Sequence, residues 1–362
     1  MHLIFDENFL IFIKWVILFQ IILITSLILA SIVTKIYFHN KNKKRKNHFD
    51  ILINTLKVLT INNQEVNSKI LSLSRKFIPN LLRAIDELDE ELQSPHWQKI
   101  RTQLIQKVLL PHAKSFTNAK AWFKRYLATR IFELDRQKSD ERKILILIKD
   151  DLPLVSINAA IIALKYPTQM MINTIIDVFS TGRHIQQSTF AKILAEEANV
   201  ELATSFIISC IKKEKNPYKK AFCYRLLTNF PAQQEIFHEA YDDIQSNNLE
   251  LEIAALYYLS HNKSKNIIDI LCLNLSNEKW EIRAIAAKLL GKLNAVQSTQ
   301  LVGKHLRDEK WWVRINAAQA LTQMGKEGLA ILESQNPESD PYAYDVAQQV
   351  LKTKNLSTQG LF

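Results

Sequence analysis

The stretch that decides the fold is Asn277-Glu-Lys-Trp-Glu-Ile-Arg-Ala-Ile-Ala-Ala-Lys-Leu-Leu290, which recurs 31 residues later as Asp308-Glu-Lys-Trp-Trp-Val-Arg-Ile-Asn-Ala-Ala-Gln-Ala-Leu321. In each copy, apolar and small residues recur at helical spacing and form one stripe. A single pair of helices cannot bury such a stripe, so each repeat must stack on the next. A period of this length predicts an all-α protein with an α-solenoid of stacked helix pairs.

Weaker copies of this pattern lie on both sides of the strong ones. They occupy residues 155–164, 217–227, 249–259 and 341–351. The array is therefore predicted to cover residues 140–352, followed by a short tail, 353–362. Only 6 glycines occur in the chain of 362 residues, which agrees with an all-helical fold.

The region before the array, residues 50–139, is also predicted to be helical. Three prolines, Pro79, Pro95 and Pro111, are expected to divide it into separate helices with apolar periodicity. The sequence leaves open whether these helices continue the array or form a bundle of their own.

Polar residues stand at fixed places in the two strong copies. Asn277 and Asp308 are predicted to cap the starts of helices, and Arg283 and Arg314 follow six residues later. In this pattern the units resemble HEAT repeats, particularly the short bacterial type related to the phycobilisome lyase repeats. The resemblance implies that these four side chains bond along the stack as a ladder.

The weaker copies depart from that family pattern at the arginine position. Ser156, Glu252 and Tyr344 stand there instead. The ladder is therefore expected in two units only. The tyrosine in the last copy fits a terminal capping repeat.

An uncharged run near the N-terminus predicts a membrane anchor. Residues Trp15–Thr34 lack charge, and 20 residues of helix span about 30 Å, the thickness of a hydrocarbon core. Acidic residues precede the run, and no small-residue cleavage site follows it, so retention is expected rather than cleavage. The predicted segments are a tail at 1–14, a transmembrane helix at 15–36 and a basic segment at 37–49.

Five cations follow the apolar run closely. They are Lys41, Lys43, Lys44, Arg45 and Lys46. A basic flank keeps its side of the membrane in the cytoplasm and binds acidic headgroups. This predicts a single-pass protein of the cytoplasmic (inner) membrane, with its N-terminus outside and its solenoid in the cytoplasm.

The net charge of +11 is concentrated before the repeats. Residues 1–50 hold 7 Lys and Arg against 3 Asp and Glu, residues 51–150 hold 18 against 11, and residues 151–362 hold 22 against 22. A neutral array excludes the basic surface that nucleic acid requires, so no nucleic-acid partner is expected. The basic side chains of residues 51–150, either lying on acidic headgroups or forming an ordinary solvated surface, include Lys114, Lys120, Lys124, Arg125 and Arg130.

The sequence contains no recognisable catalytic motif, so no catalytic residue, metal ligand or cofactor is predicted. His238-Glu239 with Asp242-Asp243 is the one cluster that suggests a metal, and it is interpreted as a polar surface. The three cysteines, Cys210, Cys223 and Cys272, have no metal-ligand spacing and are predicted to be buried free thiols.

Aromatic residues are the candidates for partner binding. Trp280, Trp311, Trp312, Tyr342 and Tyr344 fall at the starts of helices in successive repeats, so stacking should align several of them on one edge. Packing between repeats is an equally good reading for Trp280 and Trp311. The second tryptophan of the pair, Trp312, is the better candidate for exposure.

Two functions follow from these features. The first is a membrane-anchored scaffold or adaptor that presents the solenoid to an unidentified protein partner, since solenoids offer extended binding faces. The alternative is a HEAT-like enzyme of the lyase or metal-dependent hydroxylase type, and it rests on the resemblance and on His238-Glu239 alone.

Overall fold

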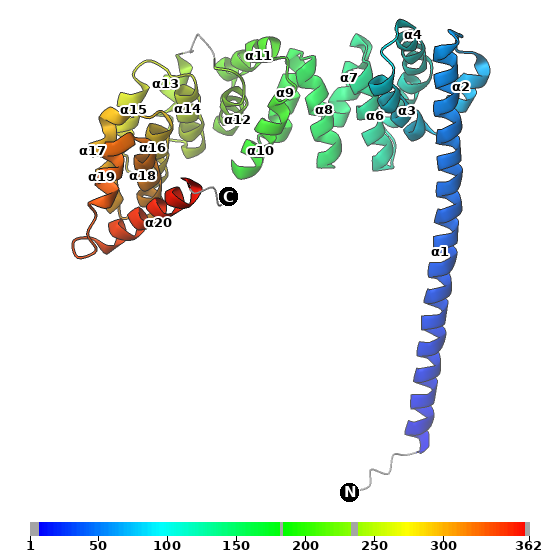
Figure 1. The fold of residues 1–362 in the computed structure, drawn as a ribbon, viewed down its shortest axis with the longest axis horizontal. Helices are drawn as coiled ribbons and strands as arrows, with labels where there is room; N and C mark the ends of the chain where they lie inside the picture. The colour runs from blue at the N-terminus through cyan, green and yellow to red at the C-terminus, as the bar shows by residue number, and fades with distance from the viewer. Residues whose placement is uncertain (1–6, 182–183, 233–237, 359–362) are drawn as a thin grey trace. The chain divides into compact units, whose positions relative to one another are not determined.

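The computed structural model describes residues 7–181, 184–232 and 238–358. Within these ranges the chain is helical and forms no strand, as the sequence predicted (Figure 1). The chain divides into two compact units, residues 1–137 and residues 138–362. Residues 1–6 of the predicted N-terminal tail and residues 359–362 of the predicted C-terminal tail lie outside the described residues.

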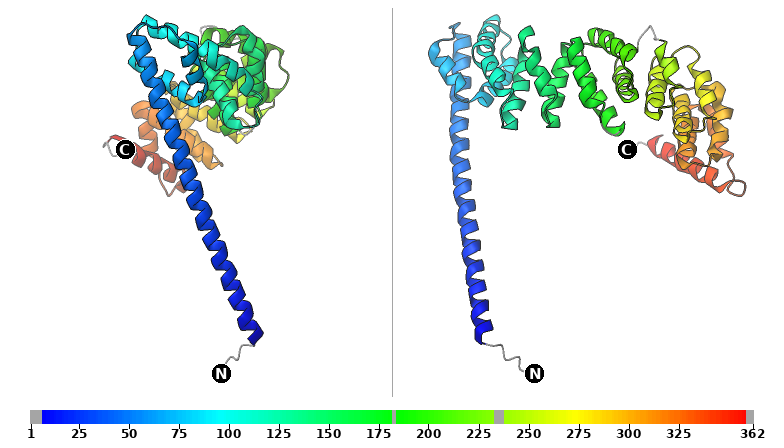
Figure 2. Two further views of the ribbon diagram at one scale, coloured as in Figure 1. Left: turned by 90° about the vertical axis from the view of Figure 1, so that its right-hand side faces the viewer. Right: turned by 180° about the vertical axis from the view of Figure 1, so that it is seen from behind.

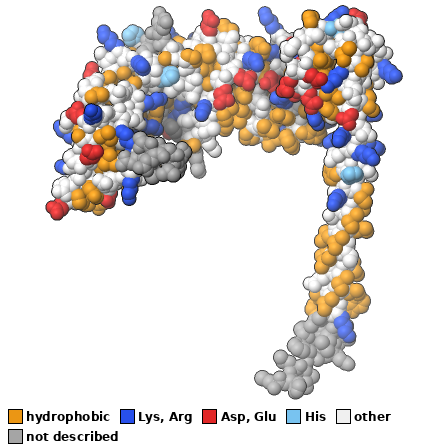
Figure 3. All heavy atoms as spheres, viewed as in Figure 1, with side chains coloured by type: hydrophobic (Ala, Val, Ile, Leu, Met, Phe, Trp, Pro, Cys, Tyr) orange, Lys and Arg blue, Asp and Glu red, His pale blue; other side chains and the backbone are white. Residues whose placement is uncertain are grey.

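The first unit is built on one long helix. Helix α1 runs without a break from Glu7 to Ile61, through the apolar run and the basic segment (Figure 2). Apolar side chains cover its N-terminal part, and Lys and Arg side chains follow them (Figure 3). Its C-terminal part packs against α3 through Leu52 and Leu56, which are fully buried.

The remaining helices of this unit lie beside the end of α1. They are α2 (Ser68–Arg75), α3 (Ile78–Glu91), α4 (Pro95–Leu104), the π-helix η1 (Ile105–Leu109), α5 (Leu110–Phe116) and α6 (Trp122–Leu134). Pro79 and Pro95 lie in the first turns of α3 and α4, as expected.

The expected break at Pro111 is wrong. Helix α4 passes through η1 into α5 without interruption. The reason is the wide π turn directly before Pro111, which bends the hydrogen-bond pattern where the proline ring and its missing N–H would otherwise interrupt an α-helix.

The second unit consists of two layers of helices. One layer holds α8 (Pro153–Lys165), α10 (His184–Ala195), α12 (Pro217–Thr228), α14 (Leu249–His261), α16 (Trp280–Lys292), α18 (Trp311–Gln323) and α20 (Pro341–Thr358). Each packs against the next, and their starts follow one another at intervals of 30–33 residues. These seven helices are called the even layer.

The other layer contains the intervening helices. They are α7 (Glu141–Ile148), α9 (Gln169–Phe179), α11 (Val200–Lys213), α13 (Glu239–Asp243), α15 (Ile267–Asn274), α17 (Thr299–Lys304) and α19 (Gly325–Glu333), with short 3₁₀ turns η2 (Lys138–Asp140), η3 (Val296–Ser298) and η4 (His305–Arg307). The core between the layers is rich in alanine, for example Ala286 and Ala317, because small side chains let helices approach closely.

The closest approach in the even layer joins α16 to α18. A Cβ built on Gly291 would lie 2.6 Å from Cα of Ala320, so no larger residue fits there without moving the helices apart. The predicted tail from residue 353 is helical as far as Thr358, because α20 continues past the point where the repeat pattern ends.

Candidate functional site

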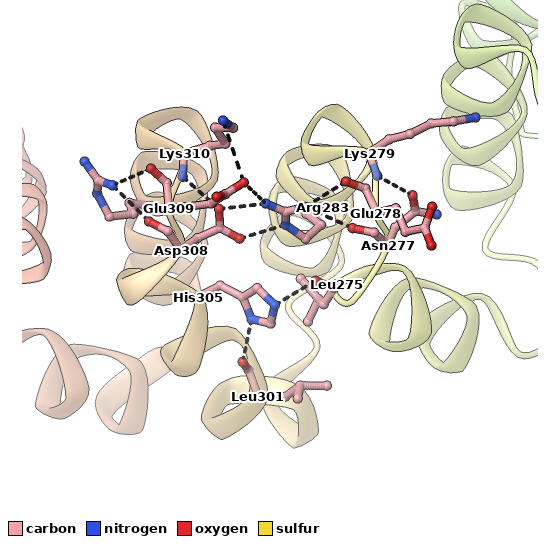
Figure 4. Close-up of polar contacts among 11 residues, drawn as sticks. Leu275, Asn277, Glu278, Lys279, Arg283, Leu301, His305, Asp308, Glu309 and Lys310 are labelled. Atoms are coloured by element: carbon pink, nitrogen blue, oxygen red, sulfur yellow. Dashed lines mark hydrogen bonds and ion pairs between the residues drawn. The ribbon is translucent and has the colours of Figure 1, made fainter.

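The residues of the predicted ladder lie where α16 and α18 begin (Figure 4). The guanidinium of Arg283 donates two hydrogen bonds to the carboxylate of Asp308, Nε to Oδ2 at 2.7 Å and Nη2 to Oδ1 at 2.9 Å. Both side chains are largely buried. This two-point ion pair therefore joins one repeat to the next, across 25 residues of sequence.

Within each strong copy, the arginine bonds to backbone and not to a side chain. Nη1 of Arg283 donates to the carbonyl oxygen of Asn277 at 3.0 Å, and Nη1 of Arg314 donates to that of Asp308 at 2.9 Å. Each arginine thus fixes the turn that precedes its own helix.

The prediction that Asn277 and Asp308 are N-caps is wrong. The caps are Lys279 and Lys310, whose side chains make no capping bond. Asn277 and Asp308 stand two residues earlier, and each accepts a hydrogen bond from the backbone N–H of the cap residue at 2.9 Å. They close Asx turns that lead the chain into the helix, which is a second use of the same side chains.

The ion pair also determines the protonation of Asp308. Its burial would raise the pKa of the carboxyl, but the hydrogen bonds from Arg283 and from the Lys310 N–H, together with nearby positive charge, lower the pKa below its usual value. The hydrogen bond to Asp308 raises the pKa of Arg283 in turn. Both groups remain charged at neutral pH.

The ladder ends at α18. Arg314 lies over the ring of Tyr342, 5.1 Å from its centre, and its Nε has no hydrogen-bond partner among the described residues. Asp340, which stands where the next acceptor would be, accepts a bond from the backbone N–H of Ala343 instead.

A contact between repeats at the fourth residue of an even-layer helix extends beyond the arginines. Gln187 of α10 accepts from Arg225, Lys220 of α12 pairs with Asp243, and Glu252 of α14 pairs with Lys279 at 2.9 Å. Sequence reasoning considered only arginine at this place, and a 31-residue register read for polarity alone would have identified these contacts.

The candidate aromatic residues fall into two groups. Trp311, Trp312 and Tyr342 are 43%, 57% and 66% exposed, while Trp280 and Tyr344 are half-buried. Trp311 is thus more exposed than its reading as core predicted, because its ring packs edge-on against Trp312 at 4.8 Å and not between the helices.

The exposed aromatics belong to a longer series. The second residue of each even-layer helix is a large exposed apolar side chain at Leu154, Ile185, Tyr218, Trp312 and Tyr342. Glu250 and Glu281 interrupt the series in α14 and α16. Because these helices pack in parallel succession, the five side chains lie along one edge of the layer, here called the helix-start edge. The first three were missed by sequence reasoning because their copies are weak.

The suggested metal cluster is not assembled. Asp243 is buried and pairs with Lys220 and with the hydroxyl of Tyr224, whereas His238 is exposed. No group of three or more potential His, Cys, Asp or Glu ligands occurs in the part of the chain that the structure describes.

The cysteines are free, and only Cys223 is fully buried. Cys210 and Cys272 are partly exposed, which differs from the expectation for both. Burial raises the pKa of all three thiols, so they are poor nucleophiles.

The five basic residues of the juxtamembrane segment lie on α1, where all but Lys41 are exposed. Lys41 lies over the ring of Tyr37, 5.6 Å from its centre. Helix α1 is the one helix in the described residues that is long and apolar enough to cross a membrane.

The family model for HEAT repeats matches residues 268–352. This range covers α15 to α20 apart from the last residues, and it includes the ladder and the exposed aromatics. The match agrees with the helical architecture and confirms the predicted HEAT-like solenoid. No curated protein matches the chain.

Proposed function

We propose that this protein is a membrane-anchored adaptor, held by the N-terminal part of α1, whose solenoid binds a protein partner on the cytoplasmic side. HEAT repeats suggest a protein-interaction solenoid, since stacked repeats present an extended surface. The anchor and its orientation carry the rest of the proposal.

The observation that best supports the anchor is the state of the hydroxyl groups in the apolar run. Thr25 donates to the carbonyl oxygen of Ile21 at 2.8 Å, Ser26 to that of Leu23 at 2.8 Å, and Thr34 to that of Ala30 at 2.7 Å. Unpaired polar groups are costly in hydrocarbon, and these are satisfied within the helix. The neighbouring apolar side chains are exposed and pack on no other helix of the protein.

The junction between anchor and first unit is structured. His48 is buried, its Nε2 lies 3.0 Å from the carbonyl oxygen of Leu73, and its Nδ1 lies 3.0 Å from the amide of Asn80. The same amide donates to the carbonyl oxygen of Arg45 at 2.8 Å. These bonds hold α1 to α3 immediately after the basic segment, so the anchor enters the first unit without a flexible linker.

The helix-start edge is the proposed partner surface, centred on Trp311, Trp312 and Tyr342. Exposed tryptophan and tyrosine bury large areas at low entropic cost, and they dominate many interfaces. A protein ligand with apolar side chains at matching spacing would cover these rings.

Fractionation and copurification test the two halves of this proposal separately. The full chain should remain in membranes under alkaline carbonate and need detergent for release. Ile24→Arg with Leu27→Arg should reduce insertion, since each arginine near the centre of the span costs about 3 kcal/mol. A C-terminal reporter should report the cytoplasm, and an external signal would contradict the orientation.

For the partner surface, Trp312→Ala with Tyr342→Ala should abolish recovery of proteins that copurify with the wild-type chain. The control is Leu273→Ala, which removes an exposed apolar side chain of α15, outside the edge. Equal recovery with both variants would reject the edge as the binding surface while leaving the anchor untouched.

A further inference from the structure

The corner between α5 and α6, residues 117–124, carries an unusual surface within the first unit. Trp122 and Phe123 are adjacent, and each is 50% exposed. The exposed side chains of Lys120 and Lys124 flank them. Aromatic rings beside cations are typical of surfaces that enter the interface of a bilayer.

Contacts with α1 fix the direction of α3. Asn80, near the start of α3, bonds to Arg45 of α1, and Glu91, at its end, pairs with Lys57 at 2.6 Å. Helix α3 therefore runs in the same direction as α1 and begins beside the basic segment.

The next helices bring the chain back to that level. Helix α4 starts beside the end of α1, where Lys99 pairs with Glu65 at 2.8 Å. Further along, the carbonyl oxygen of Lys107 accepts from Arg75, which directly precedes α3. Phe116 at the end of α5 lies nine residues farther, about 13 Å at 1.5 Å per residue, in the direction of the apolar run.

Helix α6 gives an independent estimate of the same level. Arg130 pairs with Asp86 of α3 at 3.4 Å, and each is eight residues beyond the start of its helix. Trp122 is thus level with the start of α3, beside Arg45. Both estimates place the corner alongside residues 38–48 of α1, which lie within about 15 Å of Phe38, the last apolar residue of the run.

The side chains at this corner suit a bilayer surface. Because Cα–Cβ bonds tilt toward the start of a helix, Trp122 and Phe123 project toward the apolar part of α1. Arg125 holds the corner in shape by donating from Nη1 to the carbonyl oxygens of Ala119 and Lys120 at 2.9 and 3.0 Å. Lys124 lies over the ring of Phe116 at 5.7 Å. The unit itself holds 21 Lys and Arg against 11 Asp and Glu, which favours an anionic surface.

We propose that the α5–α6 corner is a second membrane contact, in which Trp122 and Phe123 enter the headgroup layer of an anionic leaflet and Lys120 and Lys124 bind lipid phosphates. This inference rests on the proposed anchor. With both contacts, the first unit is held at two points and has a fixed orientation on the membrane.

Tryptophan quenching in bilayers tests the corner. The full chain is reconstituted in bilayers that contain phosphatidylglycerol and lipids brominated near the headgroup, which quench nearby tryptophan emission. Trp122→Phe should remove a larger share of the quenching than Trp312→Phe, which removes an exposed tryptophan of the second unit. Lys120→Glu with Lys124→Glu should reproduce that loss.

The variant Trp15→Phe distinguishes the two proposals. Loss of quenching with Trp15→Phe but none with Trp122→Phe would overturn the second contact and leave the anchor standing. No loss with Trp15→Phe would overturn the anchor itself. Loss with Trp122→Phe that is unaffected by the lysine substitutions would overturn the role given to the lysines.

Discussion

Two successive joints of the solenoid use the same positions with opposite charge. At the joint between α16 and α18, Arg283 reaches forward to Asp308. At the joint between α14 and α16, Glu252 occupies the corresponding fourth position and pairs with Lys279. Asn277, which is neutral, stands where Asp308 stands in the next repeat. The geometry of the joint is therefore preserved while the direction of the charge is reversed.

The difference teaches that the repeat is defined by backbone packing more than by the ladder. Arg283 and Asp308 meet through two parallel hydrogen bonds, and their side chains are 12% and 7% exposed. Lys279 is more exposed and offers a point charge, so its pair with Glu252 is weaker in principle. Both joints nevertheless hold their helices in the same succession.

The largest effect is expected from the packing itself. Gly291→Val should push α16 and α18 apart, because its Cβ would collide with Ala320, and we expect a loss of about 2–3 kcal/mol in the local free energy of opening. Hydrogen–deuterium exchange of the α16 and α18 amides in the full chain measures this quantity.

Ser260 supplies the matched control for this glycine, because it holds the corresponding twelfth position in α14. It is buried, and its hydroxyl has no hydrogen-bond partner among the described residues. Ser260→Ala should change the free energy of opening by less than about 0.5 kcal/mol. If Gly291→Val proved equally mild, close packing would not be the dominant constraint at this joint.

The next effect concerns the ladder. Arg283→Ala and Asp308→Ala should each cost about 2 kcal/mol, and a double-mutant cycle should show coupling of similar size, because each single change leaves a largely buried charge without its partner. The same exchange measurement on α16 and α18 applies. Additive costs would show that the ion pair itself contributes nothing and that the bonds to backbone carry the stability.

Much of this architecture could be predicted from the sequence. The 31-residue period and the alanine-rich stripe predicted the helix pairs, and the pair of charged residues predicted that Arg283 and Asp308 belong to one ladder. The period alone could not show that the partner of Arg283 lies in the next repeat, because that depends on how far the helices are displaced along the stack.

Other features lay outside what a residue pattern can express. The π turn before Pro111 arises from the packing of α4 and α5, and the exposure of Trp311 depends on the ring of Trp312. Leu154, Ile185 and Tyr218 share a register with Trp312, but their repeats are too divergent to align by identity. Position within the helix, once known from the structure, identifies them at once.

A smaller effect is expected from acid. The pKa of Asp308 is lowered in the folded state, so its contribution is complete above the unfolded value near 3.9 and is lost as the pH falls through the folded pKa. The stability difference between the wild-type chain and Asp308→Asn should therefore be constant from about pH 7 to 5 and shrink below about pH 4. Exchange rates corrected for intrinsic pH dependence measure it, and a difference that does not change with pH would contradict the lowered pKa.

The smallest effect is expected at the charge-reversed joint, and it sharpens the comparison most. Glu252→Lys should destabilise α14 and α16, because it places a cation beside Lys279 in a buried position. Adding Lys279→Glu should restore most of that loss, to within about 1 kcal/mol of the wild-type chain, since the pair would then have the polarity of Arg283 and Asp308. Amide exchange in α14 and α16 gives the answer. Failure of the second substitution to rescue the first would mean that the sign of the charge at this joint is fixed by its surroundings, and the two joints would then be different structures and not two versions of one.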